Sequence, residues 1–258
     1  MLKKVFQYRD LLFMLTLRDI RIRYKQAAMG FIWALFMPIV AVCAGILIKY
    51  AMANVSGTTI DLLEVVSISV KVLPWTFFIS SIRFSVQSLV GNSSLVTKIY
   101  FPNAVLPLAS TLACLFDFAI AIIVLAVLLT VAQLGVSIYL LWLPVLIIFL
   151  FLFTAGLGLL LAAGNLFFRD IKYVVQTMLT FGIFFVPVFY SVDQFGKWSV
   201  FLLANPVGSI LEAINSVVVL QQMPDMGWFG YAGASSVFMF LIGLRIFCEK
   251  EPLFAENI

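Results

Sequence analysis

Four cations in an eight-residue stretch near the start of the chain could bind an anionic partner. In RDIRIRYK (18–25), Arg18, Arg21, Arg23 and Lys25 are interleaved with apolar residues and with Tyr24. Such a stretch is compatible with a half-buried strand or with a basic, aromatic nucleic-acid patch. On a helix, at about 100° per residue, Arg18, Arg21 and Lys25 fall within about 60° of one another. We therefore expect a helix at a membrane surface, with its basic face toward lipid headgroups.

Other side chains capable of chemistry are scarce. The chain contains no histidine, which excludes histidine metal sites, Ser–His nucleophile pairs and histidine proton switches. Cys43, Cys114 and Cys248 lie in apolar segments without metal-ligand spacing, so neither a metal site nor a disulfide framework is expected. Arg83 and Asp117 are the charges deepest in apolar segments, where a charge generally has a partner or a function. We expect them to form a structural pair, with substrate contact as the alternative.

The composition is that of an integral membrane protein. Of the 258 residues, 64% are hydrophobic and 11% are charged, and the mean hydropathy is +1.14. A soluble domain is typically about 45–50% apolar and about 25% charged. The net charge of +4 does not require a nucleic-acid partner, because cytoplasmic loops of membrane proteins carry excess Lys and Arg. The first 28 residues are charged throughout, so a cleavable signal peptide is not expected.

Six segments are apolar enough to cross a bilayer, which takes roughly 20 residues. They are residues 29–53, 72–91, 104–133, 139–164, 173–190 and 228–248. Both termini are expected in the cytoplasm, because this arrangement places twelve of the 16 Lys and Arg on the inner side. The predicted fold is all-α and membrane-embedded, with six transmembrane helices and an N-terminal interfacial helix.

The chain is expected to form one transmembrane domain over residues 1–258. Its parts are a cytoplasmic interfacial helix (1–28), spans one to five (29–190), an outer segment (191–227), span six (228–248) and a cytoplasmic tail (249–258). The outer segment is apolar but interrupted by glycines and prolines, so we expect short helices there, one of them starting at Asn205-Pro206. Glu212 in this segment is expected to face water rather than an exiting substrate.

Residues after the basic stretch carry a family resemblance. The segment RDIRIRYKQAAMGFIWALFMPI (18–39) resembles the N-terminal signature of the type-2 ABC permeases that export O-antigen, teichoic acid and capsule polysaccharides. The matching positions are Arg23, Tyr24, Gly30, Trp33, Ala34 and Pro38, while Met29 replaces the usual leucine. NLFFRDIKYVVQ (165–176) is similar to the family's loop before the fifth span. FFVPVFYSVDQF (184–195), followed by Asn205-Pro206, provides a third match.

The resemblance implies a homodimeric, multi-pass permease in the bacterial cytoplasmic membrane that exports a lipid-linked polysaccharide. The chain lacks the phosphate-binding pattern G-x-x-x-x-G-K-[ST], so it should bind no cofactor itself. ATP and Mg would be bound by two copies of a separate ATPase subunit. The residues expected to contact that subunit are Arg18, Arg21, Arg23, Lys25, Ser94, Lys98 and Tyr100.

In that family the first and fifth spans line the path between the protomers, and residues 191–222 match its outer gate helices. The corresponding aromatic path residues here are Trp33, Phe36, Phe181, Phe184, Phe185, Phe189 and Tyr190. An aromatic face can stack on sugar rings without requiring one hydroxyl pattern, which suits a sliding polymer. Because the chain has 26 Phe, lipid-facing or core packing is the alternative for each. Arg169 and Asp170 would couple the inner loop to the fifth span, or Asp170 would simply cap that helix.

Three alternatives remain open at the level of the sequence. Within the family, the substrate could be a drug or a small lipid. A membrane-embedded glycolipid enzyme would need clustered carboxylates near the interface, which the sequence does not suggest. An ion-coupled transporter would need inverted repeats and midplane ion ligands, for which Asp117 alone is thin support.

Overall fold

The computed structural model describes residues 6–25, 32–56 and 62–257, and within these ranges every regular element is a helix. Within the described ranges, four helices are long and apolar enough to cross a membrane. They are α4 (Leu62–Gln87), α6 (Val105–Val131), α7 (Leu143–Phe167) and α11 (Met226–Lys250). At about 1.5 Å per residue, each exceeds the roughly 30 Å of bilayer hydrocarbon. The prediction of an all-α membrane protein is confirmed.

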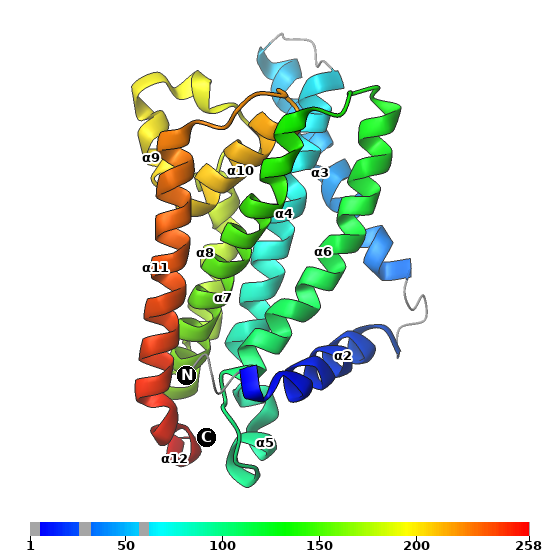
Figure 1. Ribbon diagram of the computed structural model, residues 1–258. Helices are drawn as coiled ribbons and strands as arrows, with labels where there is room; N and C mark the ends of the chain where they lie inside the picture. The colour runs from blue at the N-terminus through cyan, green and yellow to red at the C-terminus, as the bar shows by residue number, and fades with distance from the viewer. Residues whose placement is uncertain (1–5, 26–31, 57–61, 258) are drawn as a thin grey trace.

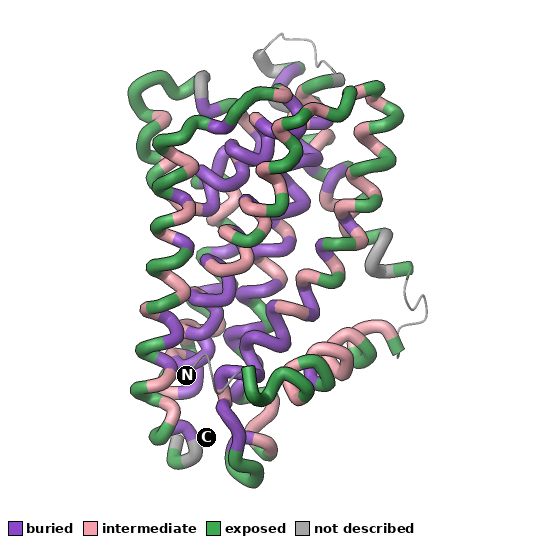
Figure 2. Tube along the Cα trace, viewed as in Figure 1, coloured by how far each residue is buried: buried purple, intermediate pink, exposed green. Residues whose placement is uncertain are grey.

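Two other helices contain shorter apolar stretches. α3 (Ile32–Ser56) is apolar over Phe36–Ala51, and α8 (Ile171–Gly182) continues into the 3-10 turn η3 (Ile183–Phe185). α4 is the most enclosed long helix, and it packs against α3, α6, α7, α8 and α10 (Pro206–Val218). Figure 2 shows the buried residues concentrated around this central helix, while the outward faces of α6 and α11 are exposed.

The two ends of the bundle differ in character. α2 (Arg9–Lys25) crosses the start of α6, near the short helices α5 (Ser93–Lys98) and α12 (Phe254–Asn257) (Figure 1). We call this the basic end, because it presents Arg21, Lys25 and Lys98. The opposite end holds η4 (Val192–Trp198), α9 (Ser199–Leu203) and α10. The basic stretch is thus helical, as predicted.

Capping residues define the start of two helices. Asn205 accepts a hydrogen bond from the Val207 amide at 3.1 Å, and Pro206 occupies the first turn of α10, as the sequence predicts. Asp225 accepts from the Gly227 amide at 2.8 Å and starts α11. Gln133 and Gln221 have positive φ in the connections that follow α6 and α10.

The second predicted span begins too late in the sequence. α4 starts ten residues before the expected position of 72, because Lys71 lies inside the protein rather than at a membrane boundary. Its ammonium is 2.8 Å from a carboxylate oxygen of Glu212, and its side chain is only 3% exposed. The sequence suggests that the span should start after the charge of Lys71. The ion pair with Glu212 instead allows the helix to continue through this charge.

The fifth predicted span, 173–190, is not one continuous helix. α8 ends at Gly182, η3 ends at Phe185, and Val186 adopts an extended conformation at φ −124° and ψ 136°. Pro187 explains this break, because proline disfavours the helical conformation in the residue before it. The expectation of a span over all of 173–190 is wrong in this respect.

Glycines bring α7 and α11 unusually close together. A Cβ atom on Gly243 would collide with the backbone of Gly156, and one on Gly156 would collide with the backbone of Met239 and Phe240. Small residues allow membrane helices to pack backbone against backbone in this way. The α7–α11 pair therefore forms a rigid support on one side of the bundle.

Candidate functional site

α8 has one buried side and one exposed side of mixed chemistry. Val175 and Leu179 are buried against the bundle. The opposite side, which we call the α8 face, exposes aromatic, hydroxyl and amide groups: Tyr173, Gln176, Thr177, Thr180, Phe181 and Phe184. Residues 173, 177, 180 and 184 follow helical spacing and therefore share one side. The composition suits a surface that meets a ligand carrying both apolar and hydroxyl groups.

The polar groups of this face are held in place by the helix itself. Thr177 donates its hydroxyl hydrogen to the Tyr173 carbonyl at 2.9 Å, and Thr180 donates to the Gln176 carbonyl at 2.8 Å. Each hydroxyl oxygen still carries lone pairs that can accept from a ligand. The sequence predicted Phe181 and Phe184 here but missed the other four residues, although the helical period from 173 to 184 is a signal that could have found them.

The remaining aromatic candidates are not all on one surface. Phe185 is 72% exposed and Phe36, on α3, is 46% exposed. Phe189 is buried, so its predicted place on an exposed aromatic path is not supported. Tyr190 is partly buried and donates its hydroxyl to the Phe184 carbonyl at 3.0 Å. Trp33 lies in α3, but its side chain falls outside the described part of the structure.

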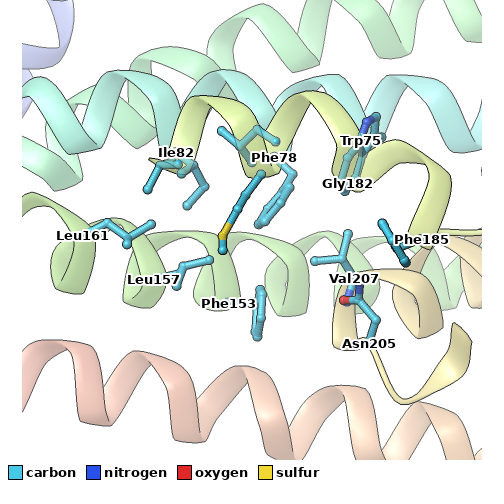
Figure 3. A pocket seen from close by; sticks show the side chains of 13 residues that line it. Trp75, Phe78, Ile82, Phe153, Leu157, Leu161, Gly182, Phe185, Asn205 and Val207 are labelled. Atoms are coloured by element: carbon cyan, nitrogen blue, oxygen red, sulfur yellow. The ribbon is translucent and has the colours of Figure 1, made fainter. Parts of the chain in front are cut away.

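An apolar cavity of about 330 Å³ lies beneath α8, between it and helices α4 and α7. Figure 3 shows Phe78 and Phe153 projecting toward this space, with Trp75, Gly182 and Phe185 near one end. Interiors are normally packed with few voids larger than a water molecule. α8 is therefore supported over a loosely filled volume, and a shift of this helix disturbs fewer contacts than a shift of α7 would.

A polar junction attaches α2 to α6. The Arg23 guanidinium is 2.5 Å from one oxygen of Asp117, and the Tyr24 hydroxyl donates to the other oxygen at 2.6 Å. The guanidinium carbon also lies 3.9 Å from the centre of the Phe84 ring on α4, a cation–π distance. Burial and the hydrogen bond to Asp117 raise the pKa of Tyr24, so its hydroxyl remains a donor at neutral pH.

This junction corrects the predicted pairing of Asp117 with Arg83. α2 packs along the first half of α6, so that Asp19 meets Ser110 and Arg23 meets Asp117. Arg83 is exposed on α4 and forms no ion pair with any residue of the described ranges. Asp19 adds a second attachment: it accepts from Ser110 at 3.3 Å and pairs with Arg18 at 2.8 Å. The Arg-Tyr pair of the sequence signature thus anchors α2 on α6.

The other residues expected to contact an ATPase face outward at the basic end. Arg21, Lys25, Ser94 and Lys98 are exposed, and Tyr100 is 94% exposed. Arg18 and Arg23 differ, since Arg23 is engaged in the junction with α6 and Arg18 pairs with Asp19 on its own helix. A cavity of about 630 Å³ lies beside Tyr100, between the residues at the start of α2, the Ile99–Asn103 segment and the C-terminal turn. Glu251 ties two of its walls together by accepting from the Asn103 amide at 2.6 Å.

Asn165 is the residue that connects the loop before α8 to the bundle. Its side-chain amide donates to the Val86 carbonyl at 2.9 Å, and its oxygen accepts from the Lys172 amide at 3.2 Å. Asp170 precedes α8 but makes no side-chain capping hydrogen bond, so the capping alternative does not hold for it. Arg169 and Asp170 are both exposed.

Polar contacts also attach α10 to α4 at the opposite end. Glu212 pairs with buried Lys71, and Ser67 donates to the Asn215 side-chain oxygen at 2.7 Å. The expectation that Glu212 faces water is wrong, because its carboxylate is directed to Lys71. Sequence reasoning missed this connection, although a lysine inside the apolar run VSISVKVLPWTFF (66–78) was a visible signal.

Long apolar helices, with α2 packed against them at the basic end, are the architecture of a multi-pass membrane protein. The model of the family described as ABC-2 type transporter matches residues 10–219, so the chain belongs to this family and is a type-2 ABC permease. The family resemblance of the sequence motifs is confirmed.

The chain is similar over its full length to curated relatives. It is 26% identical over 261 residues to an O-antigen export system permease protein RfbA of Myxococcus xanthus, which covers 100% of this chain and 99% of the relative. Two O-antigen export system permease proteins RfbA of Klebsiella pneumoniae are each 26% identical over 251 residues, covering 96% of this chain and 94% of the relative.

Proposed function

We propose that this chain is the membrane subunit of an ATP-driven exporter that moves a lipid-linked, O-antigen-like polysaccharide across the bacterial inner membrane. The observation that carries the proposal is the α8 face, which combines Tyr173, Phe181 and Phe184 with the hydroxyl groups of Thr177 and Thr180. Aromatic rings stack on sugar faces, while hydroxyls exchange hydrogen bonds with sugar hydroxyls. The names of the full-length relatives support the same class of substrate.

The α8 face is open along one side of a single chain, so a second copy would close it into a channel. We propose a homodimer with six spans in each subunit, in which α3 and α8 serve as the first and fifth spans. Residues 1–258 form one permease domain with 191–227 as outer gate helices, and the basic end is cytoplasmic with both termini. The excess of exposed cations at the basic end supports this orientation.

Phe181→Ala is expected to reduce polysaccharide export about threefold to tenfold, because a lost aromatic stacking contact is worth about 0.5–1.5 kcal/mol. The measurement is the amount of surface glycan in cells whose own permease is deleted. Phe238→Ala is the matched control, because Phe238 is 64% exposed on α11 and lies outside the α8 face. Equal export by the two variants would remove Phe181 from the path.

We further propose that two ATPase subunits bind ATP and Mg and dock on the basic end. Arg21, Lys25 and Lys98 supply exposed positive charge, and Tyr100 supplies an exposed ring beside the neighbouring cavity. The α2–α6 junction would transmit movement of the docked subunit to α6. Arg169 and Asp170 lie exposed at the start of α8, where the same movement could reach the α8 face.

Replacing Arg21 and Lys25 together by Glu is expected to lower co-purification of the ATPase subunit at least about tenfold, since like charges at an interface cost several kcal/mol. The comparison variant is Lys197→Glu, a charge reversal at the opposite end of the bundle. Undiminished co-purification together with normal export would contradict the docking proposal.

A further inference from the structure

A second polar cavity lies at the opposite end of the bundle, away from the α8 face and the α2–α6 junction. It has a volume of about 170 Å³ and is enclosed by α3, α4, α10 and the turn at 188–191. Four charged side chains line it: Lys49, Glu64, Lys71 and Glu212. The cavity is small and combines these charges with the aromatic rings of Phe189 and Tyr190.

The two lysines and two glutamates of the cavity carry no net charge together. The two ion pairs that they form differ in distance. Lys71 and Glu212 form a close pair at 2.8 Å, with the Lys71 side chain 3% exposed. Lys49 and Glu64 are 3.5 Å apart, which is longer than a hydrogen bond, and the Glu64 side chain is 45% exposed. The first pair holds α10 in place, whereas the second leaves a carboxylate and an ammonium accessible from the cavity. A balanced set of charges favours an uncharged ligand with many hydrogen-bonding groups.

Tyr190 links the cavity to the end of the α8 face. Tyr190 lines the cavity, and its hydroxyl donates to the carbonyl of Phe184, which belongs to the α8 face. Phe189 forms part of the wall on the same side. Aromatic rings beside a carboxylate and an ammonium can stack on a sugar and bind its hydroxyls, which both donate and accept.

We infer that this cavity is a saccharide subsite that holds one uncharged pyranose ring of the polymer after it has passed the α8 face, with Glu64 and Lys49 binding its hydroxyls. The inference rests on the proposed function and adds a specific outer contact to it. With a volume of about 170 Å³, the cavity is of the size of one sugar ring, so the subsite would engage successive residues of a moving chain one at a time.

Saturation-transfer NMR on the permease with its ATPase partner in nanodiscs tests this inference. The probes are the methyl glycosides of glucose, galactose, mannose and N-acetylglucosamine, with inorganic phosphate as the charged alternative. Glu64→Gln is the test variant, because Glu64 is half-exposed and its replacement keeps the size of the side chain. Glu249→Gln is the matched control, since Glu249 is 58% exposed at the other end of the molecule.

We expect at least one glycoside to bind the wild type and the control equally, and to bind Glu64→Gln about tenfold more weakly, as the loss of a charged hydrogen bond predicts. Because the α8 face also contacts sugar, the readout is the difference between the two variants rather than the raw signal. Equal affinities in the two variants, or binding of phosphate in preference to every glycoside, would overturn the subsite. Surface glycan that persists after deletion of the permease would instead overturn the proposed function, whichever result the NMR gives.

Discussion

Removal of the Glu212 carboxylate is expected to destabilise the protein by about 3–5 kcal/mol, the cost of leaving one member of a buried ion pair unpaired. Lys71 is 3% exposed, so in Glu212→Ala its ammonium could not be solvated without moving α10 away from α4. Ser67 and Asn215 lie on the same two helices and would lose their 2.7 Å hydrogen bond in that movement. The measurement is the thermal unfolding of the purified permease in detergent.

A double variant separates the charge from the packing at this site. Lys71→Met combined with Glu212→Leu removes both charges and keeps apolar volume, so it should recover most of the lost stability. An exposed pair offers the control: Glu249→Ala removes a surface partner of Arg245 and should change the stability by less than about 1 kcal/mol. If Glu212→Ala were as stable as Glu249→Ala, the pair could not be what holds α10 on α4.

Asp117→Ala is expected to cost about 2–3 kcal/mol and to release α2 from α6. The effect should be smaller than at Glu212, because the Asp117 side chain is 29% exposed and water can partly solvate Arg23 after the change. The Asp117 carboxylate accepts hydrogen bonds from Arg23 and Tyr24. It also holds the Arg23 guanidinium in place over the Phe84 ring. Asp117→Asn should have an intermediate effect, because an amide can still accept a hydrogen bond from Tyr24.

Protease accessibility of α2, read together with unfolding temperature, would measure the Asp117 effect. The expected result is faster cleavage within α2 in Asp117→Ala, with Arg83→Ala as the matched control because Arg83 is exposed and unpaired with Asp117. Equal effects of Asp117→Ala and Arg83→Ala would restore the pairing that the sequence alone suggests and would contradict the anchoring role of Arg23.

The parts of the fold that depend on local pattern could be predicted from the sequence. α6, α7 and α11 lie within a few residues of the predicted spans, because each is a long apolar run with clear ends. α4 begins earlier than predicted, since the charge of Lys71 is neutralised by a residue 141 positions away. α8 ends earlier than predicted, because the apolar run over 173–190 continues past Pro187 whereas the helix does not reach it.

The site shows the same division between local and long-range information. Phe184 could be found from its motif and Phe181 from its place in the fifth span, and the polar members of the α8 face follow once a helical period is applied from Tyr173. The partner of Asp117 could not be found, because it depends on the angle at which α2 crosses α6. The hydrogen bond from Asn165 to Val86 could not be found from the sequence either, because it joins residues of different helices through a backbone carbonyl.

The central claim is that the polysaccharide moves along the α8 face, and a photo-crosslinking measurement tests it most directly. A benzoylphenylalanine placed at Thr177, in the middle of that face, would be irradiated in exporting cells, with the same probe at Phe238 on α11 as the control. The account predicts permease adducts of high and heterogeneous mass that react with a glycan-specific antibody at position 177 and not at 238. Glycan adducts that are absent at 177, or equally abundant at both positions, would contradict it.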